Sequence, residues 1–563
     1  MLKFFREKAQ VIGWVIVIVF GGTMFAGSLF FRKAYKANKA YEANQPINTL
    51  DSIAILGNIS LTKGKFYEVY FQALSEFKSK NLNKVIPPEI KELLMYSAFN
   101  QGLQFSIILD GAKRNDIKAS RADLKRNLSL IYKQYNLRGK KDLKEMLKKN
   151  GVSYSNFIND VKQNIIVQKF VETLMAKVSV TDKDIENKYT EIKLKHILIK
   201  PDLTDTKEIL AKEKVANILV KINEGLSFED AAKKYSDDTV TSLLGGDLGW
   251  LAINKADPNF EEAAYLLEVN EISKPVKSAH GYHLIKMTEK KILPRPKDLD
   301  IQKEKAELLQ LKKEQTVASY IQTVQNKNKL EIFDPMIKAY KSKIEGDYNS
   351  AINAYQTLVT KSPASPVPHY LLAKVYTMLG DSKNAKHEAL KAEIKGTINP
   401  ELDIPQTYIV LGDILLEETY KNRKLPKKTR DEIKVKIMRK KAVHKYQLKK
   451  MMGKSYSASN SKNFSTPDVS DIIRTEIGKT ISERRLPKLA MTKYDKALVL
   501  SDGDLIGLKQ LQELFLELNA QSRSKKVAAK IAAIEKQAKE LKDQKNTEEI
   551  KLDIDNLNID IKN

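Results

Sequence analysis

Two short stretches in the middle of the chain decide its fold. Residues 243–251 read LLGGDLGWL, and residues 280–287 read HGYHLIKM. The second stretch holds two of the six histidines in a chain of 563 residues. Histidines three positions apart, behind an apolar run broken by three glycines, indicate a local site. The sequence around them decides whether that site belongs to an enzyme.

The surrounding sequence predicts a small α+β domain over residues 191–292. Residues 193–200, KLKHILIK, alternate in polarity and are rich in branched side chains, as is typical of a strand, and they include His196. Two helices follow, the second opening at the capping sequence SFED. DLGWL predicts a strand, PNFEEAAYLL a helix, and KPVK and YHLIKM two more strands. The predicted order is strand, two helices, strand, helix, strand, strand.

Five blocks of this region closely resemble the parvulin family of peptidyl-prolyl cis/trans isomerases, in order and in spacing. The blocks are KHILIK (195–200), GLSFEDAAKKYSDD (225–238), GGDLGW (245–250), PNFEEAAYLL (258–267) and EISKPVKSAHGYHLIKM (271–287). The resemblance covers residues 193–290. It implies that the glycines build a turn over the sheet and that two histidines face each other on neighbouring strands.

The resemblance also assigns roles to seven residues. The implied catalytic residues are His196, Asp238 and His283. The implied substrate-binding residues are Leu248, Ala256, Phe260 and His280. Asp238 falls where the family carries cysteine or aspartate, and the two catalytic histidines form a hydrogen-bonded pair in the family. The chain departs from the family pattern at Ala256, where many relatives have methionine, and at His280, where some have serine.

The implied reaction breaks no covalent bond. Rotation about a peptide bond has a barrier of about 18–20 kcal/mol. A pocket that desolvates the amide and holds the proline ring by apolar contact favours the twisted amide over the planar one. No nucleophile, metal or cofactor is required. A histidine pair on adjacent strands can also be a satisfied core element, so a domain that only binds extended chains stays open as the alternative.

The N-terminus predicts a membrane anchor. Three basic residues precede an uncharged stretch over 11–31, which as a helix is long enough for a bilayer core of about 30 Å. We expect residues 1–33 to form a cytoplasmic tip and transmembrane helix, and 34–50 a polar tether. A signal peptide cleaved near Ser28 is the alternative. A single anchor after so short a leader places the rest of the chain on the extracytoplasmic, periplasmic side of a bacterial cytoplasmic membrane.

Residues 51–190 predict an all-α domain without a catalytic constellation. Apolar residues recur at helical spacing, and Thr181 with Asp184 forms a predicted capping box at a helix start. The arrangement of anchor, helices, parvulin domain and a further helix resembles membrane-anchored bacterial foldases that carry a chaperone domain. The resemblance implies that residues 298–333 return to complete the N-terminal helices, so that the parvulin domain is an insertion.

The C-terminal part predicts an α-solenoid of tetratricopeptide type. Gly346 and Ala351 recur as Gly380 and Ala385, an interval of 34 residues that equals the period of these repeats. We assign four ranges: repeats at 336–420, an exposed basic insertion at 421–480, further repeat-like helices at 481–542 and a polar tail at 543–563.

The composition narrows the function classes. A formal net charge of +27 would suit nucleic acid, but no aromatic-basic interleaving accompanies the lysines, and the predicted anchor argues against that partner. The absence of cysteine excludes thiolate chemistry. The sequence predicts a multidomain, membrane-anchored isomerase and chaperone for exported proteins. Its expected partners are unfolded or proline-containing clients, the membrane, and a protein partner of the repeats. The alternative is an inactive holdase or scaffold.

Overall fold

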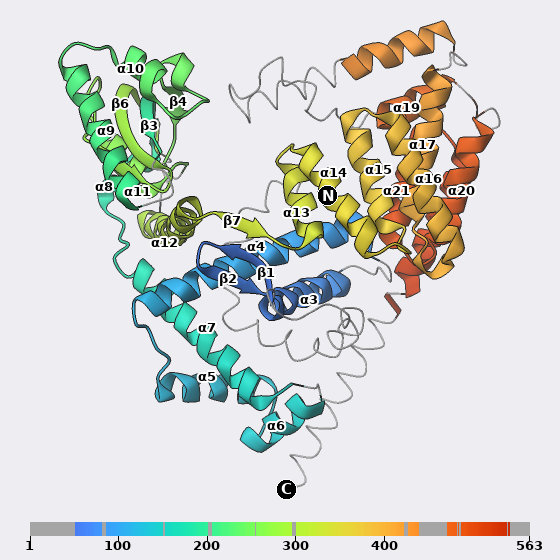
Figure 1. Ribbon diagram of the computed structural model, residues 1–563, viewed down its shortest axis with the longest axis horizontal. Coiled ribbons are helices and arrows are strands. Elements are labelled where there is room, and N and C mark those ends of the chain that lie inside the picture. The colour runs from blue at the N-terminus through green and yellow to red at the C-terminus, as the bar shows by residue number, and fades with distance from the viewer. Residues whose placement is uncertain are drawn as a thin grey trace. The chain divides into compact units, whose positions relative to one another are not determined.

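The computed structural model describes the chain in stretches separated by gaps (Figure 1). The described residues are 51–80, 86–149, 152–200, 205–253, 255–295, 300–421, 426–438, 470–480, 482, 486–537 and 539–540. The predicted anchor, tether and polar tail lie outside them. Within these stretches, no helix has an apolar run that could traverse a bilayer.

The described residues divide into two compact units. Residues 51–72 and 97–333 belong to the first unit, and residues 73–96 together with those from 334 onward belong to the second. Two of the boundaries fall inside helices, α3 (Lys63–Lys80) and α4 (Pro88–Arg114), and a third falls between Phe333 and Asp334.

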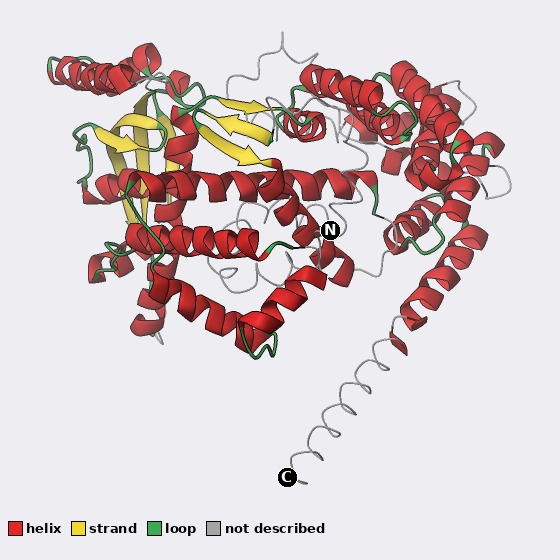
Figure 2. Ribbon diagram, turned by 60° about the horizontal axis from the view of Figure 1, so that its bottom comes forward, coloured by secondary structure: helices red, strands yellow, loops and turns green. Residues whose placement is uncertain are grey.

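The first unit begins with the predicted helical region, and this region is not all-α. Its helices after α4 are α5 (Arg121–Gln134), α6 (Lys140–Lys149), α7 (Tyr154–Met175), α8 (Asp182–Lys188) and, after the inserted domain, α12 (Ile301–Lys327). A small antiparallel sheet of order β2-β1-β7 accompanies them (Figure 2). Its strands are β1 (Ser52–Leu56), β2 (Ile59–Thr62) and β7 (Leu330–Ile332).

The all-α prediction is wrong at this sheet because its strands are short and come from distant parts of the chain. β1 and β2 form a hairpin, and β1 also pairs with β7, where Ala54 faces Ile332. Helix α12 lies against α7, with the rings of Phe170 and Tyr320 5.3 Å apart. The capping box predicted at Thr181 is confirmed, since Thr181 and Asp184 each accept the other's backbone N–H.

Residues 190–292 fold as the predicted α+β domain, with the predicted order of elements. Its strands are β3 (Thr190–Ile199), β4 (Asp247–Leu251), β5 (Val276–Ser278) and β6 (Gly281–Ile292), in the antiparallel order β4-β3-β6-β5. Its helices are α9 (Asp205–Asn223), α10 (Phe228–Tyr235), the 3₁₀ turn η1 (Ser242–Leu244) and α11 (Pro258–Leu266). The domain enters and leaves through neighbouring strands, since Thr190 pairs with Ile292.

Each face of this sheet has its own apolar core. On one face, Ile197 and Leu284 pack with residues of α9 and α10. On the other face, Ile285 and Met287 pack with Phe260 of α11. Because side chains alternate across a strand, His196 lies on the α11 face.

The second unit is helical from residue 335 onward. Its helices are α13 (Pro335–Ile344), α14 (Tyr348–Lys361), α15 (Val367–Leu379), α16 (Ser382–Ile398), α17 (Pro405–Lys421), one over 427–438, α19 (Ser470–Thr480), α20 (Lys488–Leu500), α21 (Leu505–Glu517) and one over 521–537. From α13 to α17 each helix packs against the next, and α17 then pairs with α20. At that crossing Gly412 lies so close to Tyr494 that a Cβ would come within 2.3 Å of its ring.

The range 421–480, expected to be exposed, contains two packed helices. Ile433, Ile473 and Ile477 are buried in the same core as Tyr408 and Tyr494. The expectation of exposure is therefore wrong for these helices, because their apolar residues complete the α17–α20 pair.

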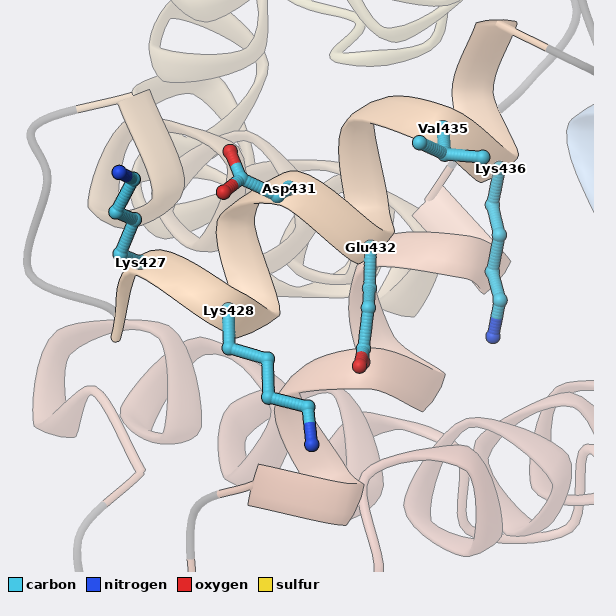
Figure 3. Close-up of a pocket in the computed structure, with 6 residues that line it drawn as sticks. All are labelled: Lys427, Lys428, Asp431, Glu432, Val435 and Lys436. Atoms are coloured by element: carbon cyan, nitrogen blue, oxygen red, sulfur yellow. The ribbon is translucent and has the colours of Figure 1, made fainter.

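The outer side of the helix over 427–438 is charged and lines a pocket of about 700 Å³ (Figure 3). The lining residues are Lys427, Lys428, Asp431, Glu432, Val435 and Lys436. The pocket belongs to the second unit, whereas the two paired histidines belong to the first.

Candidate active site

Two buried histidines meet on adjacent strands of the α+β domain. In the β3–β6 ladder, Leu198 pairs with His283, which makes His196 and His283 diagonal neighbours on one face. Their Nδ1 atoms are 3.3 Å apart, and their rings stack at a centroid distance of 5.5 Å. Both side chains are nearly inaccessible, with His196 6% and His283 5% exposed.

The second ring nitrogen of His196 meets a carboxylate. His196 Nε2 lies 2.8 Å from Oδ2 of Asp238 and 3.1 Å from the Thr241 hydroxyl. The Thr241 hydroxyl donates to the same carboxylate oxygen, and the Val240 N–H donates to the other. Burial alone would raise the pKa of Asp238, but these hydrogen bonds outweigh it and hold the pKa well below its usual range. Asp238 is therefore ionised at neutral pH.

The second ring nitrogen of His283 meets a hydroxyl. His283 Nε2 lies 2.7 Å from Ser278 Oγ, which also accepts the N–H of His280. Burial, followed by the neighbouring His196 and His280, lowers the pKa of His283 from 6.5 to about 3. His283 is therefore neutral under physiological conditions.

These contacts set the direction of the hydrogen bond between His196 and the carboxylate. An ionised Asp238 can only accept, so His196 must donate from Nε2. In the His196 tautomer that carries its single ring proton on Nε2, Nδ1 accepts, and His283 then donates from its Nδ1 and accepts at Nε2. The Ser278 hydroxyl is then the donor to His283 Nε2. The result is a one-way relay from Ser278 to Asp238 that holds both rings in one tautomer and orientation.

An aromatic side chain and a glycine turn complete the site. Phe260, only 4% exposed, meets both imidazoles edge to face, at centroid distances of 6.0 Å to His196 and 5.0 Å to His283. The carbonyl of Gly246 accepts the His196 N–H at 2.8 Å. Gly246 has φ +83°, and a Cβ there would lie 2.3 Å from the His196 carbonyl oxygen. The second glycine of LLGGDLGWL therefore allows the loop to close directly over the histidine strand.

The structure brings together four of the seven residues proposed from the sequence: His196, Asp238, His283 and Phe260. Ala256 packs against the apolar cluster that contains Phe260. Leu248 lies on β4 and is 39% exposed. His280 is exposed. Its own contact is with the Gln322 side-chain amide at 3.3 Å.

The sequence reading missed two hydroxyl residues of the relay, Thr241 and Ser278. Thr241 follows Asp238 by three residues in a loop, and Ser278 precedes the HGYH sequence. Thr241 lies in a turn and Ser278 at the end of β5, and the tertiary placement of both is not encoded by any local periodicity. Their position beside a predicted acid and a predicted histidine was the only available signal.

Helix α12 contacts the rim of this site. Asn326 donates its side-chain amide to the Ala279 carbonyl at 2.8 Å. The Ser319 hydroxyl donates to Asp257 at 2.8 Å, and Asp257 also accepts the Ala279 N–H. The turn between β5 and β6 is therefore held by a helix that belongs to the N-terminal region.

The depressed pKa of His283 predicts an acid-sensitive domain. On acidification, the unfolded chain binds a proton at His283 near pH 6.5, but the folded chain does so only near 3. Stability is therefore fully present above pH 6.5 and falls by up to about 1.4 kcal/mol per pH unit below it. Trp14 and Trp250 are the two tryptophans, so a Trp14→Phe variant reports on β4 through Trp250 alone. Urea unfolding followed by its fluorescence between pH 4.5 and 7.5 measures the slope.

His283→Gln in the same background is the matched control, because glutamine keeps hydrogen-bonding groups but does not titrate. Its slope should be clearly smaller. Parallel pH curves for the two proteins would show that His283 does not carry the effect.

Comparison with known proteins agrees with this geometry. The PPIC-type PPIASE domain description matches residues 175–291, and the SurA-like N-terminal domain description matches residues 1–171. The site and the first match together define a parvulin-type peptidyl-prolyl cis/trans isomerase domain.

The relatives are foldases. The chain is 31% identical over 250 residues to foldase protein PrsA 3 of Bacillus cereus, which covers 43% of this chain and 78% of that relative. It is therefore a member of the PrsA foldase family. It is also 34% identical over 197 residues to foldase protein PrsA 2 of Bacillus anthracis, covering 35% of this chain and 62% of that relative.

The chain is also similar to a solved structure, that of peptidylprolyl isomerase (PrsA) from Bacillus anthracis. It is 28% identical, and the match covers 39% of this chain and 93% of that one, with a TM-score of 0.20. Several curated relatives are matched over less than two thirds of their length, as for PrsA 2 of Bacillus anthracis at 62% and PrsA 2 of Bacillus cereus at 54%.

Proposed function

We propose that the chain is a membrane-anchored peptidyl-prolyl cis/trans isomerase and chaperone that assists the folding of exported proteins. The observation that carries the isomerase part is the relay from Ser278 through His283 and His196 to Asp238, against Phe260. The proposed catalytic residues are His196, Asp238 and His283. Phe260 and Ala256, with Leu248 and His280 at the edge of the site, are the proposed substrate contacts.

The geometry suits amide rotation because it offers a fixed, weakly polar surface. In the transition state the amide loses resonance and its carbonyl becomes less dipolar than in the planar ground state. Neutral imidazoles in fixed tautomers and an apolar ring replace the water that would stabilise the planar, more dipolar amide. The chemistry proceeds without covalent bonding to the protein, so orientation and desolvation are what the residues supply.

The remaining parts of the proposal rest on the neighbouring regions. The SurA-like N-terminal description matches residues 1–171, and the helices in this range, with α12 packed against α7, supply the proposed chaperone surface. The uncharged stretch over 11–31 supports the membrane anchor, with the bulk of the chain on the extracytoplasmic side. Mature protein beginning near Ser28 would contradict the anchor. The 34-residue interval and the helical pairs from α13 to α16 support tetratricopeptide repeats that bind a protein partner.

The function is tested by separating the two activities. The full chain should accelerate isomerisation of an X-Pro peptide and suppress aggregation of a denatured client. A variant lacking 193–290, closed by a short linker, should lose the first activity and keep the second at comparable stoichiometry. The linker is feasible because Thr190 and Ile292 are paired neighbours. The large apolar area that holds a client lies outside a pocket lined by a few side chains.

Two results would contradict the proposal. If the folded full chain showed no isomerisation above background, the domain would be one that only binds extended chains. Loss of aggregation suppression in the deletion variant, with its helical circular dichroism intact, would place the client-binding surface on the isomerase domain.

A further inference from the structure

Two glutamates near the start of α4 pack into the second unit, where Glu92 is buried and Glu89 is half-buried. Glu92 is 1% exposed, and its Oε2 accepts from Nζ of Lys343 at 2.6 Å. Its Oε1 accepts from the Tyr355 hydroxyl. Glu89, one helical turn earlier, accepts from the Tyr370 hydroxyl through Oε1. Residues three apart share one face of a helix, so both carboxylates are presented side by side.

The groups that receive these carboxylates come from three successive helices. Lys343 belongs to α13, Tyr355 to α14 and Tyr370 to α15. The tyrosine rings are fully buried and their hydroxyls face the carboxylates. An aromatic contact extends the same interface, since the rings of Tyr96 and Tyr340 lie 5.2 Å apart.

The polarity of this contact is unusual for a permanent core. Glu89 Oε2 is buried and has no hydrogen-bond partner among the described residues. Burial raises the pKa of Glu89, against the attraction of Lys374 and other groups. A buried ion pair adds little net stability compared with apolar residues of the same volume, but a mismatched partner is strongly disfavoured. The chemistry therefore favours selective recognition over maximal stability.

We propose that α13, α14 and α15 form a binding site for an acidic helix with glutamates three residues apart, and that α4 occupies this site from within the same chain. We name this site the glutamate site, which comprises Lys343, Tyr355 and Tyr370. Its ligand class is a helix with the sequence pattern Glu-x-x-Glu. This proposal does not depend on isomerase activity.

The test uses the full chain and amide hydrogen exchange. Glu92→Gln keeps the shape of the side chain but removes the negative charge that pairs with the Lys343 ammonium. A double variant carries Glu89→Gln as well. Exchange should rise by about tenfold or more in residues 88–96 and in α13–α15, while α20 and α21 keep their protection. Glu345→Gln is the matched control, because Glu345 pairs with Lys341 at the surface, where exchange should not change.

A second arm tests recognition directly. A synthetic peptide of residues 86–97, added at about 1 mM to the double variant, should restore protection to α13–α15. The same peptide with glutamine at positions 89 and 92 should not. Three results would each overturn the proposal: unchanged exchange in both variants, unfolding of the whole second unit, or equal protection by the two peptides. Each would mean that the contact is ordinary packing and not selective recognition.

Discussion

Replacing Asp238 by alanine is expected to lower kcat/KM of the full chain for an X-Pro peptide by about 10- to 150-fold. The range corresponds to the loss of a hydrogen bond to a charged group, about 1.5–3 kcal/mol. Without the carboxylate, His196 Nε2 keeps only the Thr241 hydroxyl, which can donate as well as accept. The His196 tautomer is then no longer imposed, and the direction of the bond to His283 is lost with it.

The neighbouring Asp237 provides a matched control for this prediction. Its carboxylate accepts the Lys200 N–H at 2.9 Å and takes no part in the relay. Asp237→Ala should leave kcat/KM within about threefold of the wild type, because it removes an ordinary loop contact. Equal losses in both variants would point to a general disturbance of the loop rather than to the relay. Thr241→Val should fall between the two.

Replacing Arg474 by methionine is expected to destabilise the packing of α19 (Ser470–Thr480) against α17 and α21 by about 3 kcal/mol. Arg474 is 14% exposed and donates to Asp413 at 2.7 Å and to Glu517 at 2.5 Å. Asp413 in turn accepts from the Tyr494 hydroxyl at 2.8 Å. Removing the guanidinium leaves two largely buried carboxylates without their cation. Amide exchange in α19 measures the effect as an opening equilibrium constant about 150-fold larger.

Arg523 supplies the comparison for this prediction. It donates to both oxygens of Asp495, but Asp495 is 46% exposed. Arg523→Met should therefore cost under about 1 kcal/mol, as surface ion pairs usually do. If the two variants were equally destabilised, α19 would be held by its apolar residues and not by the charge cluster.

The sequence was sufficient for the α+β domain because its signals are local. Alternation in KLKHILIK and the helix cap at Ser227 of SFED depend on residues within a few positions, and the structure has both elements. The pairing of His196 with His283 followed from resemblance and could not be derived from spacing alone.

Features that depend on distant residues were not visible in the sequence. β7 is a three-residue strand whose partner β1 lies near the start of the described chain. The packing of α19 depends on Arg474 reaching carboxylates on two other helices. The burial of Glu89 and Glu92 requires tyrosines more than 250 residues away. In each case the physical cause is a tertiary partner, which a reading of local pattern does not contain.

The adjacency of Thr190 and Ile292 has a consequence for the order in which the protein acquires structure. The isomerase domain is complete once Ile292 has been made, whereas α7, which ends at Met175, lacks its partner α12 until Lys327 has been made. At a synthesis rate of about 5–20 residues per second, the interval from Met175 to Lys327 takes roughly 8–30 s. During synthesis, a finished enzyme should therefore be tethered beside its own incomplete chaperone helices. The nascent chain's exposed apolar helices would then be the first clients that this protein encounters.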